Sequence, residues 1–234
     1  MTVLTVPGIT NLRDVGGMPV GSSRIREGVL FRSGNLAHAG EQARTFLDAS
    51  VAHIVDLRDD SEVMAEPCAI DGLHITRVPL FAGSVASFLL GDVSLGGLYR
   101  HIVDDGADRV VQVVRILSAG EPTLVHCTLG KDRTGVTVAL ALAAVGADRD
   151  AIVDDYALTA LQLPASRNRA IAAWLQEHLP MAQNAIAVAT QSPAPVMREL
   201  LERIDAAHGS AADYLRGAGL SSAELDALGE ALVG

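Results

Sequence analysis

The chain has 234 residues, of which 49% are hydrophobic and 3% aromatic, and its formal net charge is −10. A chain of this length and hydrophobic content can bury one large core, so we expect a single domain over residues 1–234. The acidic balance argues against nucleic acid or an anionic membrane surface as the general partner, so an anionic ligand would need a locally positive site.

Short runs of apolar or β-branched residues predict strands at residues 29–31, 53–57, 74–78 and 123–126. Helical patterns occur between them, at 40–47, around 98–117 and at 136–145. This alternation predicts an α/β fold with a central, mostly parallel sheet flanked by helices. Ligands of such sheets bind beyond the carboxyl ends of the strands, where Cys127 and Arg58 are both expected to lie.

After Asp148 the sequence becomes helical throughout, with interruptions expected at Pro164, Pro180, Pro193 and Pro195. We predict helices over residues 165–179, 182–190, 196–207 and 222–232, the last of them capped by Ser221. The C-terminal part of the chain is therefore expected to be all helical.

Residues 126–135 read His-Cys-Thr-Leu-Gly-Lys-Asp-Arg-Thr-Gly and join a predicted strand to a predicted helix. Five residues lie between Cys127 and Arg133, so a curled loop would point its backbone amides at one position above the sulfur. The free amides of a helix N-terminus, the helix dipole and Arg133 all favour negative charge there. We therefore predict a Cys127 thiolate and a phosphate site formed by Cys127, Thr128, Leu129, Gly130, Lys131, Asp132 and Arg133.

Cys68 lacks a glycine-rich loop and a following apolar helix, so it is expected to be a buried small side chain. Two cysteines in such different settings make no disulfide framework, which fits a reducing compartment. The start of the chain carries no basic segment and no long apolar stretch, so we expect a cytoplasmic protein without a membrane span. Export without a cleaved signal stays compatible with the sequence. The sequence does not determine the oligomeric state.

The string at 126–135 resembles the signature loop of cysteine-dependent protein tyrosine phosphatases. Its Gly-Lys-Asp-Arg-Thr-Gly part is similar to the bacterial branch typified by mycobacterial protein tyrosine phosphatase B. Segments 11–17, 28–34, 55–58 and 152–156 are also similar to that branch, so the likeness covers nearly the whole chain. It implies a phosphomonoester hydrolase of the protein tyrosine or dual-specificity class, without a cofactor.

The resemblance implies a role for each of several residues. Cys127 would attack phosphorus to form a phosphocysteine, while Arg133 would hold the equatorial oxygens of the phosphoryl group. Thr134 would donate to the leaving thiolate or cap the helix. The proton for the leaving group would come from Asp132, within the loop, or from Asp56, near the end of a predicted strand.

Further expectations concern the surroundings of the loop. Arg13, Arg32, Arg58 and Lys131 are candidates to widen its positive field; for Arg13, a clamp on the N-terminal segment, shared with Asp14, is the favoured role. His126 is expected to fix loop geometry. The resembled branch has a mobile helical lid, which we place at residues 165–207, and ordinary core packing of these helices is the alternative.

Two alternatives to protein dephosphorylation stay open. Family members with a lysine at the position of Lys131 accept phosphoinositides, so a lipid head group is one alternative substrate. A non-catalytic module that binds phosphorylated ligands is the other alternative. The seven histidines are scattered along the chain and show no recognisable metal-ligand spacing, so no metal site is expected.

Overall fold

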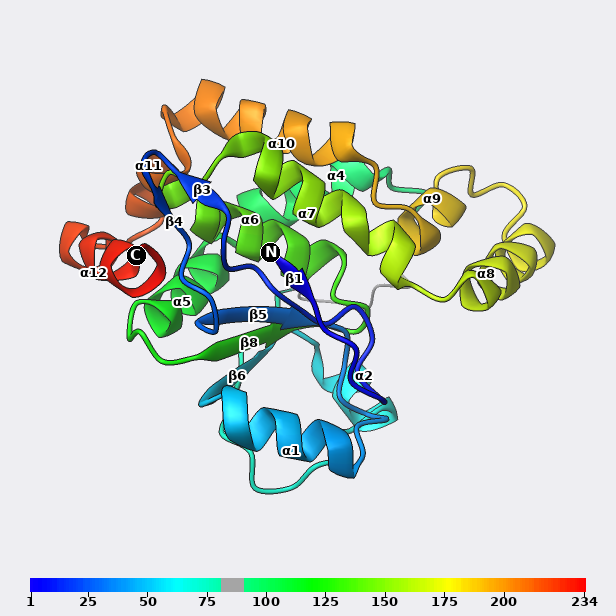
Figure 1. The fold of residues 1–234 in the computed structure, drawn as a ribbon. Helices are drawn as coiled ribbons and strands as arrows, with labels where there is room; N and C mark the ends of the chain where they lie inside the picture. The colour runs from blue at the N-terminus through cyan, green and yellow to red at the C-terminus, as the bar shows by residue number, and fades with distance from the viewer. Residues whose placement is uncertain (81–90) are drawn as a thin grey trace.

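A mixed sheet forms the centre of the computed structural model, which describes residues 1–80 and 91–234 (Figure 1). Within these residues its strands are β1 (Thr2–Val3), β2 (Arg13–Asp14), β5 (Leu30–Ser33), β6 (His53–Asp56), β7 (Ile75–Arg77) and β8 (Thr123–His126). The order across the sheet is β1-β2-β5-β8-β6-β7. The last four strands of this order are parallel, whereas β1 and β2 form an antiparallel edge. The predicted α/β class and mostly parallel sheet are confirmed.

Short strands near the N-terminus were not predicted. These are β1, β2 and a separate hairpin of β3 (Pro19–Val20) and β4 (Ser23–Arg24). Each has only two residues, which is too short to show the alternation of apolar and polar side chains that identifies a strand in a sequence.

Helices cover both faces of the sheet, as predicted. Phe31, Leu124 and Ile54 lie in register on β5, β8 and β6 and belong to the apolar cluster that includes α1. Their chain neighbours Leu30, Val125 and Val55 belong to a larger cluster with the later helices, because successive strand side chains point to opposite faces. Figure 1 shows α1 on one side of the sheet and α5, α6 and α7 on the other.

The helices that were predicted begin and end close to their expected positions, with two differences, whereas those at residues 60–65, 149–162 and 211–217 had no predicted bounds. In chain order the described residues form α1 (Glu41–Ser50), α2 (Asp60–Ala65), α4 (Leu95–Asp105), α5 (Ala107–Leu117), α6 (Asp132–Ala144), α7 (Arg149–Gln162), α8 (Ala165–His178), α9 (Ala185–Thr190), α10 (Ala194–His208), α11 (Ala211–Gly217) and α12 (Ser222–Leu232). The single stretch expected around 98–117 is two helices that meet at Gly106, and α6 begins at Asp132, earlier than expected. No helix in the described part of the chain combines the length and apolar character needed to cross a bilayer.

Proline and serine set several boundaries of the C-terminal helices. Pro164 and Pro193 stand at the N-caps of α8 and α10. Pro195 does not interrupt a helix as expected, because it lies in the first turn of α10, where a missing amide hydrogen costs no hydrogen bond. Ser221 caps α12 as predicted: its side chain accepts a hydrogen bond from the amide of Glu224.

Candidate active site

A cavity of about 220 Å³ lies against the loop that follows β8. Five of the predicted site residues line it: Cys127, Thr128, Leu129, Asp132 and Arg133. The remaining walls come from elsewhere in the chain, with Glu62 from α2, Leu98 from α4, Arg167 and Ile171 from α8, and Val188 and Ala189 from α9. The thiol of Cys127 and the guanidinium of Arg133 therefore line the same cavity, as the predicted phosphate site requires.

The loop can take its shape because residue 130 is glycine. Gly130 has a φ of 66°, in the left-handed region that residues with a Cβ rarely adopt. A Cβ built at this position would lie 2.1 Å from the carbonyl oxygen of Ser33 on β5. Any other residue here would clash with this backbone and push the loop away from the sheet.

The N-terminal segment holds the loop by its carbonyl groups. Asn11 donates to the carbonyls of Leu129 and Gly130, both at 3.0 Å, and Arg32 donates to that of Gly130 at 2.9 Å. None of the described residues accepts a hydrogen bond from the amides of residues 128–132. Backbone amides without a protein partner are the groups that can bind an anion, which is the role expected of this loop from the sequence.

One buried carboxylate anchors this N-terminal segment. Asp155 of α7 accepts from Arg13 at 2.6 Å and from Arg32 at 2.5 Å. Burial alone would raise the pKa of Asp155, but the charges of Arg32 and Arg13 outweigh it and lower the pKa. Arg13 thus acts as the expected clamp, and Asp14 accepts from the amides of Gly16 and Gly28.

The carboxylate of Glu62 balances the charge of Arg133 and binds its fork, which is the pair of terminal nitrogens of the guanidinium. The two terminal nitrogens of Arg133 each donate to Glu62 at 2.6 Å, and Thr128 also donates to Glu62. Burial would raise the pKa of Glu62, but the hydrogen bonds and charge of Arg133 outweigh it and lower the pKa to about 2. Glu62 is therefore an anion at neutral pH, and it binds the Arg133 guanidinium through both oxygens, in the bidentate way in which arginine binds carboxylates and phosphates.

Lys131 does not face the cavity, and it is not a solvated surface lysine. Its side chain is 1% exposed, and its ammonium donates to the carbonyls of Val188 and Gln191, both at 2.7 Å. It also lies 3.2 Å from the carboxylate of Asp132. Lys131 therefore ties the loop to the end of α9.

The other expected contributors to a positive field also have buried partners. Arg13 and Arg32 bond Asp155, and Arg58 donates to both oxygens of Asp56 and to the carbonyl of Glu66. Arg58 is 1% exposed and does not line the cavity, contrary to expectation. The arginines that do line it are Arg133 and Arg167.

The two candidate acids have different surroundings. Asp132 lines the cavity and accepts from Tyr99 at 2.8 Å; Tyr156 donates in turn to Tyr99, since the Tyr99 proton is already engaged. Asp56 does not line the cavity, and its oxygens bond Arg58. Burial would raise the pKa of Asp56, but the hydrogen bond from Arg58 outweighs it and the pKa is lowered. A carboxyl with a lowered pKa is a poor proton donor at neutral pH.

Two further residues of the signature loop, Thr134 and His126, are buried. The hydroxyl of Thr134 is buried without a hydrogen-bond partner among the described residues, and the N-terminus of α6 has no side-chain cap. The alternative that Thr134 caps the helix is therefore wrong. His126 lies 3.2 Å from the carbonyl oxygen of Cys127 through Nδ1, and burial lowers the pKa of His126, so the ring is neutral.

Glu62, Arg167 and Tyr99 were missed by the sequence analysis. Glu62 had one local signal, because Asp59 and Glu62 have the spacing of a capping box and form one at the start of α2. This spacing predicts the start of a helix, but it does not predict the ion pair between Glu62 and Arg133. Arg167 and Tyr99 have no such signal, since only the packing of α8 and α4 brings them to the loop.

Comparison with known proteins places the chain in a family. The sequence pattern of the tyrosine phosphatase family matches residues 4–234. The chain is 32% identical over 282 aligned positions to the triple specificity protein phosphatase PtpB of Mycobacterium tuberculosis (strain ATCC 25618 / H37Rv), with 100% of both chains covered. It is 32% identical over 230 positions to a putative tyrosine-protein phosphatase, H16_A0669, of Cupriavidus necator, across 90% of this chain and 81% of the relative. The resemblance noted in the sequence is confirmed, and the chain belongs to the tyrosine phosphatase family.

Proposed function

We propose that this phosphatase hydrolyses phosphomonoesters of proteins through a phosphocysteine at Cys127. One observation carries the proposal: Cys127 and Arg133 line a single cavity with Thr128, Leu129 and Asp132 of the same loop, and a carboxylate binds the Arg133 fork there. A phosphate monoester has the same planar pair of oxygens to offer to a guanidinium. The sulfur then lies below phosphorus, in line with the leaving oxygen.

The reaction proceeds in two displacements. In the first, the Cys127 thiolate attacks phosphorus, the bond to the leaving oxygen breaks, and Asp132 gives that oxygen its proton. In the second, water attacks phosphorus, Asp132 takes a proton from it, and the sulfur–phosphorus bond breaks. Arg133 binds equatorial oxygens in both steps. The unpartnered hydroxyl of Thr134 donates to the sulfur as the thiolate leaves.

Substrate binding has to accommodate the pair of Arg133 and Glu62. A guanidinium has five N–H donors, and Glu62 accepts one from each terminal nitrogen of Arg133, so a phosphate binds beside Glu62 or displaces a carboxylate oxygen from the fork. Thr128, which also donates to Glu62, lies in the same loop. The ion pair therefore keeps Arg133 oriented before the substrate arrives, in the direction the reaction needs.

The walls of the cavity support a phosphorylated aromatic side chain as substrate. Leu98, Ile171 and Val188 are apolar and face the same space as Arg133, and Arg167 adds a second guanidinium. A phenyl ring buries more surface against such walls than a serine or threonine methylene group can. Phosphotyrosine is thus the favoured substrate; a phosphoinositide is the alternative. A cytoplasmic location is part of the proposal.

The covalent intermediate gives the direct test of this proposal. We expect an acid quench during turnover of para-nitrophenyl phosphate to trap one phosphoryl group per chain on the peptide that contains Cys127. Cys68, which is partly buried and donates to the carbonyl of Ile70, serves as internal control and should stay unmodified. Turnover without any phosphorylated cysteine, measured by mass spectrometry, would contradict the phosphocysteine route.

Paired aspartate variants test the identity of the acid. Asp132→Asn is expected to lower kcat for a substrate with a poor leaving group, such as phosphotyrosine, by about 10²-fold or more, because a positioned acid contributes about 10²–10⁴-fold. Loss of the acid should also flatten the high-pH limb of the rate profile. Asp56→Asn should leave the pH profile unchanged in shape. The opposite pattern would move the acid to Asp56, and two unchanged profiles would exclude both residues.

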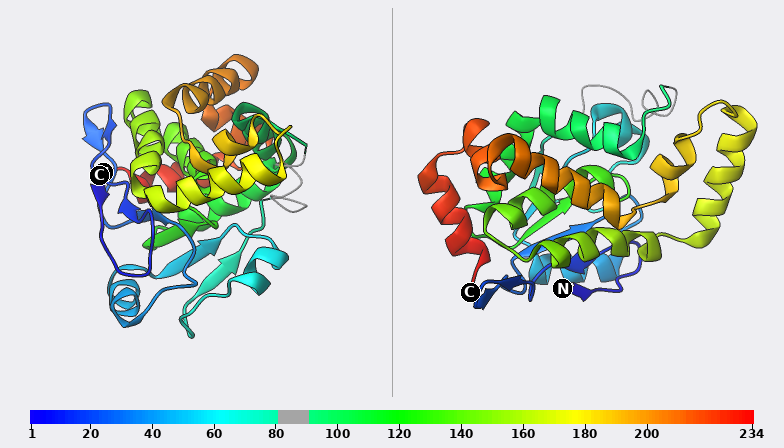
Figure 2. Two further views of the ribbon diagram at one scale, coloured as in Figure 1. Left: turned by 90° about the vertical axis from the view of Figure 1, so that its right-hand side faces the viewer. Right: turned by 90° about the horizontal axis from the view of Figure 1, so that it is seen from above.

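We propose a shorter lid than the one expected from the sequence. Leu175 is the buried side chain of α8, whereas α10 buries Met197, Leu200, Leu201 and Ile204 in the main core. Figure 2 shows α8 and α9 extending from one end of the molecule, and both contribute walls to the cavity. Val188 of α9 also belongs to the main core, and its carbonyl accepts from the buried Lys131. We therefore propose α8, residues 165–178, as the lid in place of the whole of 165–207.

Limited proteolysis can test this lid. Trypsin cuts after arginine, and α8 contains Arg167 and Arg169, whereas Arg216 on α11 provides a control site outside the lid. Saturating inorganic phosphate is expected to slow cleavage in α8 severalfold and leave cleavage after Arg216 unchanged. Identical rates with and without phosphate would count against a lid and favour ordinary core cover.

A further inference from the structure

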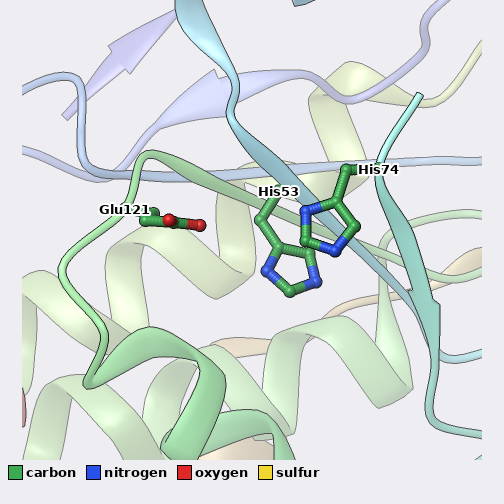
Figure 3. Close-up of side chains that lie close together, drawn as sticks. All are labelled: His53, His74 and Glu121. Carbon is green, nitrogen blue, oxygen red and sulfur yellow. The ribbon is translucent and has the colours of Figure 1, made fainter. Parts of the chain in front are cut away.

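Three side chains with metal-binding chemistry meet at the amino ends of β6, β7 and β8 (Figure 3). His53 is the first residue of β6, His74 directly precedes β7, and Glu121 lies two residues before β8. One potential ligand atom from each lies within 4.8 Å of the others. The cluster is at the opposite end of these strands from Cys127, which follows the carboxyl end of β8, so the phosphatase site does not use it.

The sheet itself brings the three residues together. In the parallel ladder His53 pairs with Thr123, and Ile54 pairs with Ile75, so His53 and His74 lie side by side. The amide of Ile54 donates to the carbonyl of His74 at 2.9 Å, and the amide of His53 donates to that of Pro122, next to Glu121, at 3.1 Å. The backbone of the cluster is therefore held by the core of the fold and does not depend on the three side chains.

His53 is oriented in the way that metal-binding histidines usually are. Its Nε2 lies 2.8 Å from the hydroxyl of Thr76, which leaves Nδ1 to bind an ion. The ring of His74 stacks on that of His53, with centroids 4.0 Å apart and an interplanar angle of 21°.

We propose that His53, His74 and Glu121 bind a divalent zinc ion, with water completing its coordination. Two imidazoles and one carboxylate are a donor set that suits zinc. Zinc bonds of about 2.0–2.1 Å place tetrahedral ligands roughly 3.3 Å apart, so atoms now within 4.8 Å must approach one another by at most about 1.5 Å. His74 must turn out of its stack on His53, and because His74 and Glu121 are exposed, both can move.

A bound zinc ion would link the amino ends of β6, β7 and β8 in the folded chain. An ion that binds the folded state and not the unfolded one stabilises the fold in proportion to the logarithm of its concentration over its Kd. Zinc is therefore expected to raise the Tm. It takes no part in the chemistry at Cys127.

The test uses the untagged full-length chain with Cys127→Ser, which removes the active-site thiol as a competing ligand. Titration calorimetry with zinc chloride is expected to show one ion per chain, and zinc should raise the Tm. His74→Gln and Glu121→Gln are each expected to weaken zinc binding at least about tenfold, on the scale known for loss of supporting contacts alone. The matched control, His38→Gln, removes an exposed histidine outside the cluster and should bind zinc normally.

Activity separates a folding defect from the loss of a metal site. With Cys127 restored and zinc absent, His74→Gln and Glu121→Gln are expected to hydrolyse para-nitrophenyl phosphate at the wild-type rate. The proposal is overturned if the chain binds no zinc, or if either variant binds it as tightly as the control does. Neither result would bear on the proposed phosphatase mechanism.

Discussion

Cys127→Ser is expected to lower kcat for para-nitrophenyl phosphate by about 10⁴-fold or more, the scale seen when a catalytic nucleophile is removed. The serine hydroxyl has a similar shape but stays protonated at neutral pH, so it is a much weaker nucleophile than a thiolate. Binding of inorganic phosphate should persist, because the loop amides and Arg133 remain. Steady-state kinetics and titration calorimetry measure the two effects separately.

Cys68→Ser provides the matched control, because Cys68 is partly buried and lies outside the cavity. It should keep wild-type kcat. If wild-type protein binds phosphate but hydrolyses nothing, the chain is a non-catalytic module that binds phosphorylated ligands. If Cys127→Ser hydrolyses at the wild-type rate, Cys127 is not the nucleophile.

Arg133→Lys is expected to lower kcat/KM by about 10²–10³-fold although the positive charge is kept. Arg133 offers two parallel N–H donors, both now 2.6 Å from Glu62, and an ammonium cannot reproduce that planar fork. Losing one preorganised donor at a developing charge costs about 10²–10³-fold in kcat. The measurement is a comparison of kcat and KM on para-nitrophenyl phosphate.

Glu62→Gln separates phosphate binding by Arg133 from a purely structural ion pair. If Arg133 mainly holds Glu62 in place, breaking the pair from the other side should cost as much activity as Arg133→Lys does. If Arg133 binds the phosphoryl group, Glu62→Gln should cost much less activity than Arg133→Lys, because the fork remains and the glutamine carbonyl oxygen can still accept one of its N–H groups. Thermal unfolding of both variants is the control for folding. An unchanged rate in Arg133→Lys would remove Arg133 from the mechanism.

Much of the fold could be predicted from local patterns. The parallel strands β5, β6, β7 and β8 are each an apolar run bounded by turn residues, and the capping of α12 by Ser221 follows from side-chain chemistry within one turn. Strands of two residues and the short helix α2 carry no periodic signal and were missed. The split between α4 and α5 was also missed, although Gly106 marks the position where they meet.

The sequence by itself determined the signature loop, because Cys127, Gly130 and Arg133 act within one curl of contiguous chain whose shape follows from spacing and from the backbone freedom of glycine. Only the tertiary structure decided which distant groups meet that curl. Glu62 reaches Arg133 through the position of α2, and Lys131 turns away to α9. The cluster of His53, His74 and Glu121 arises in the same way, because the register of three parallel strands aligns residues far apart in the chain, and no spacing along a sequence encodes that register.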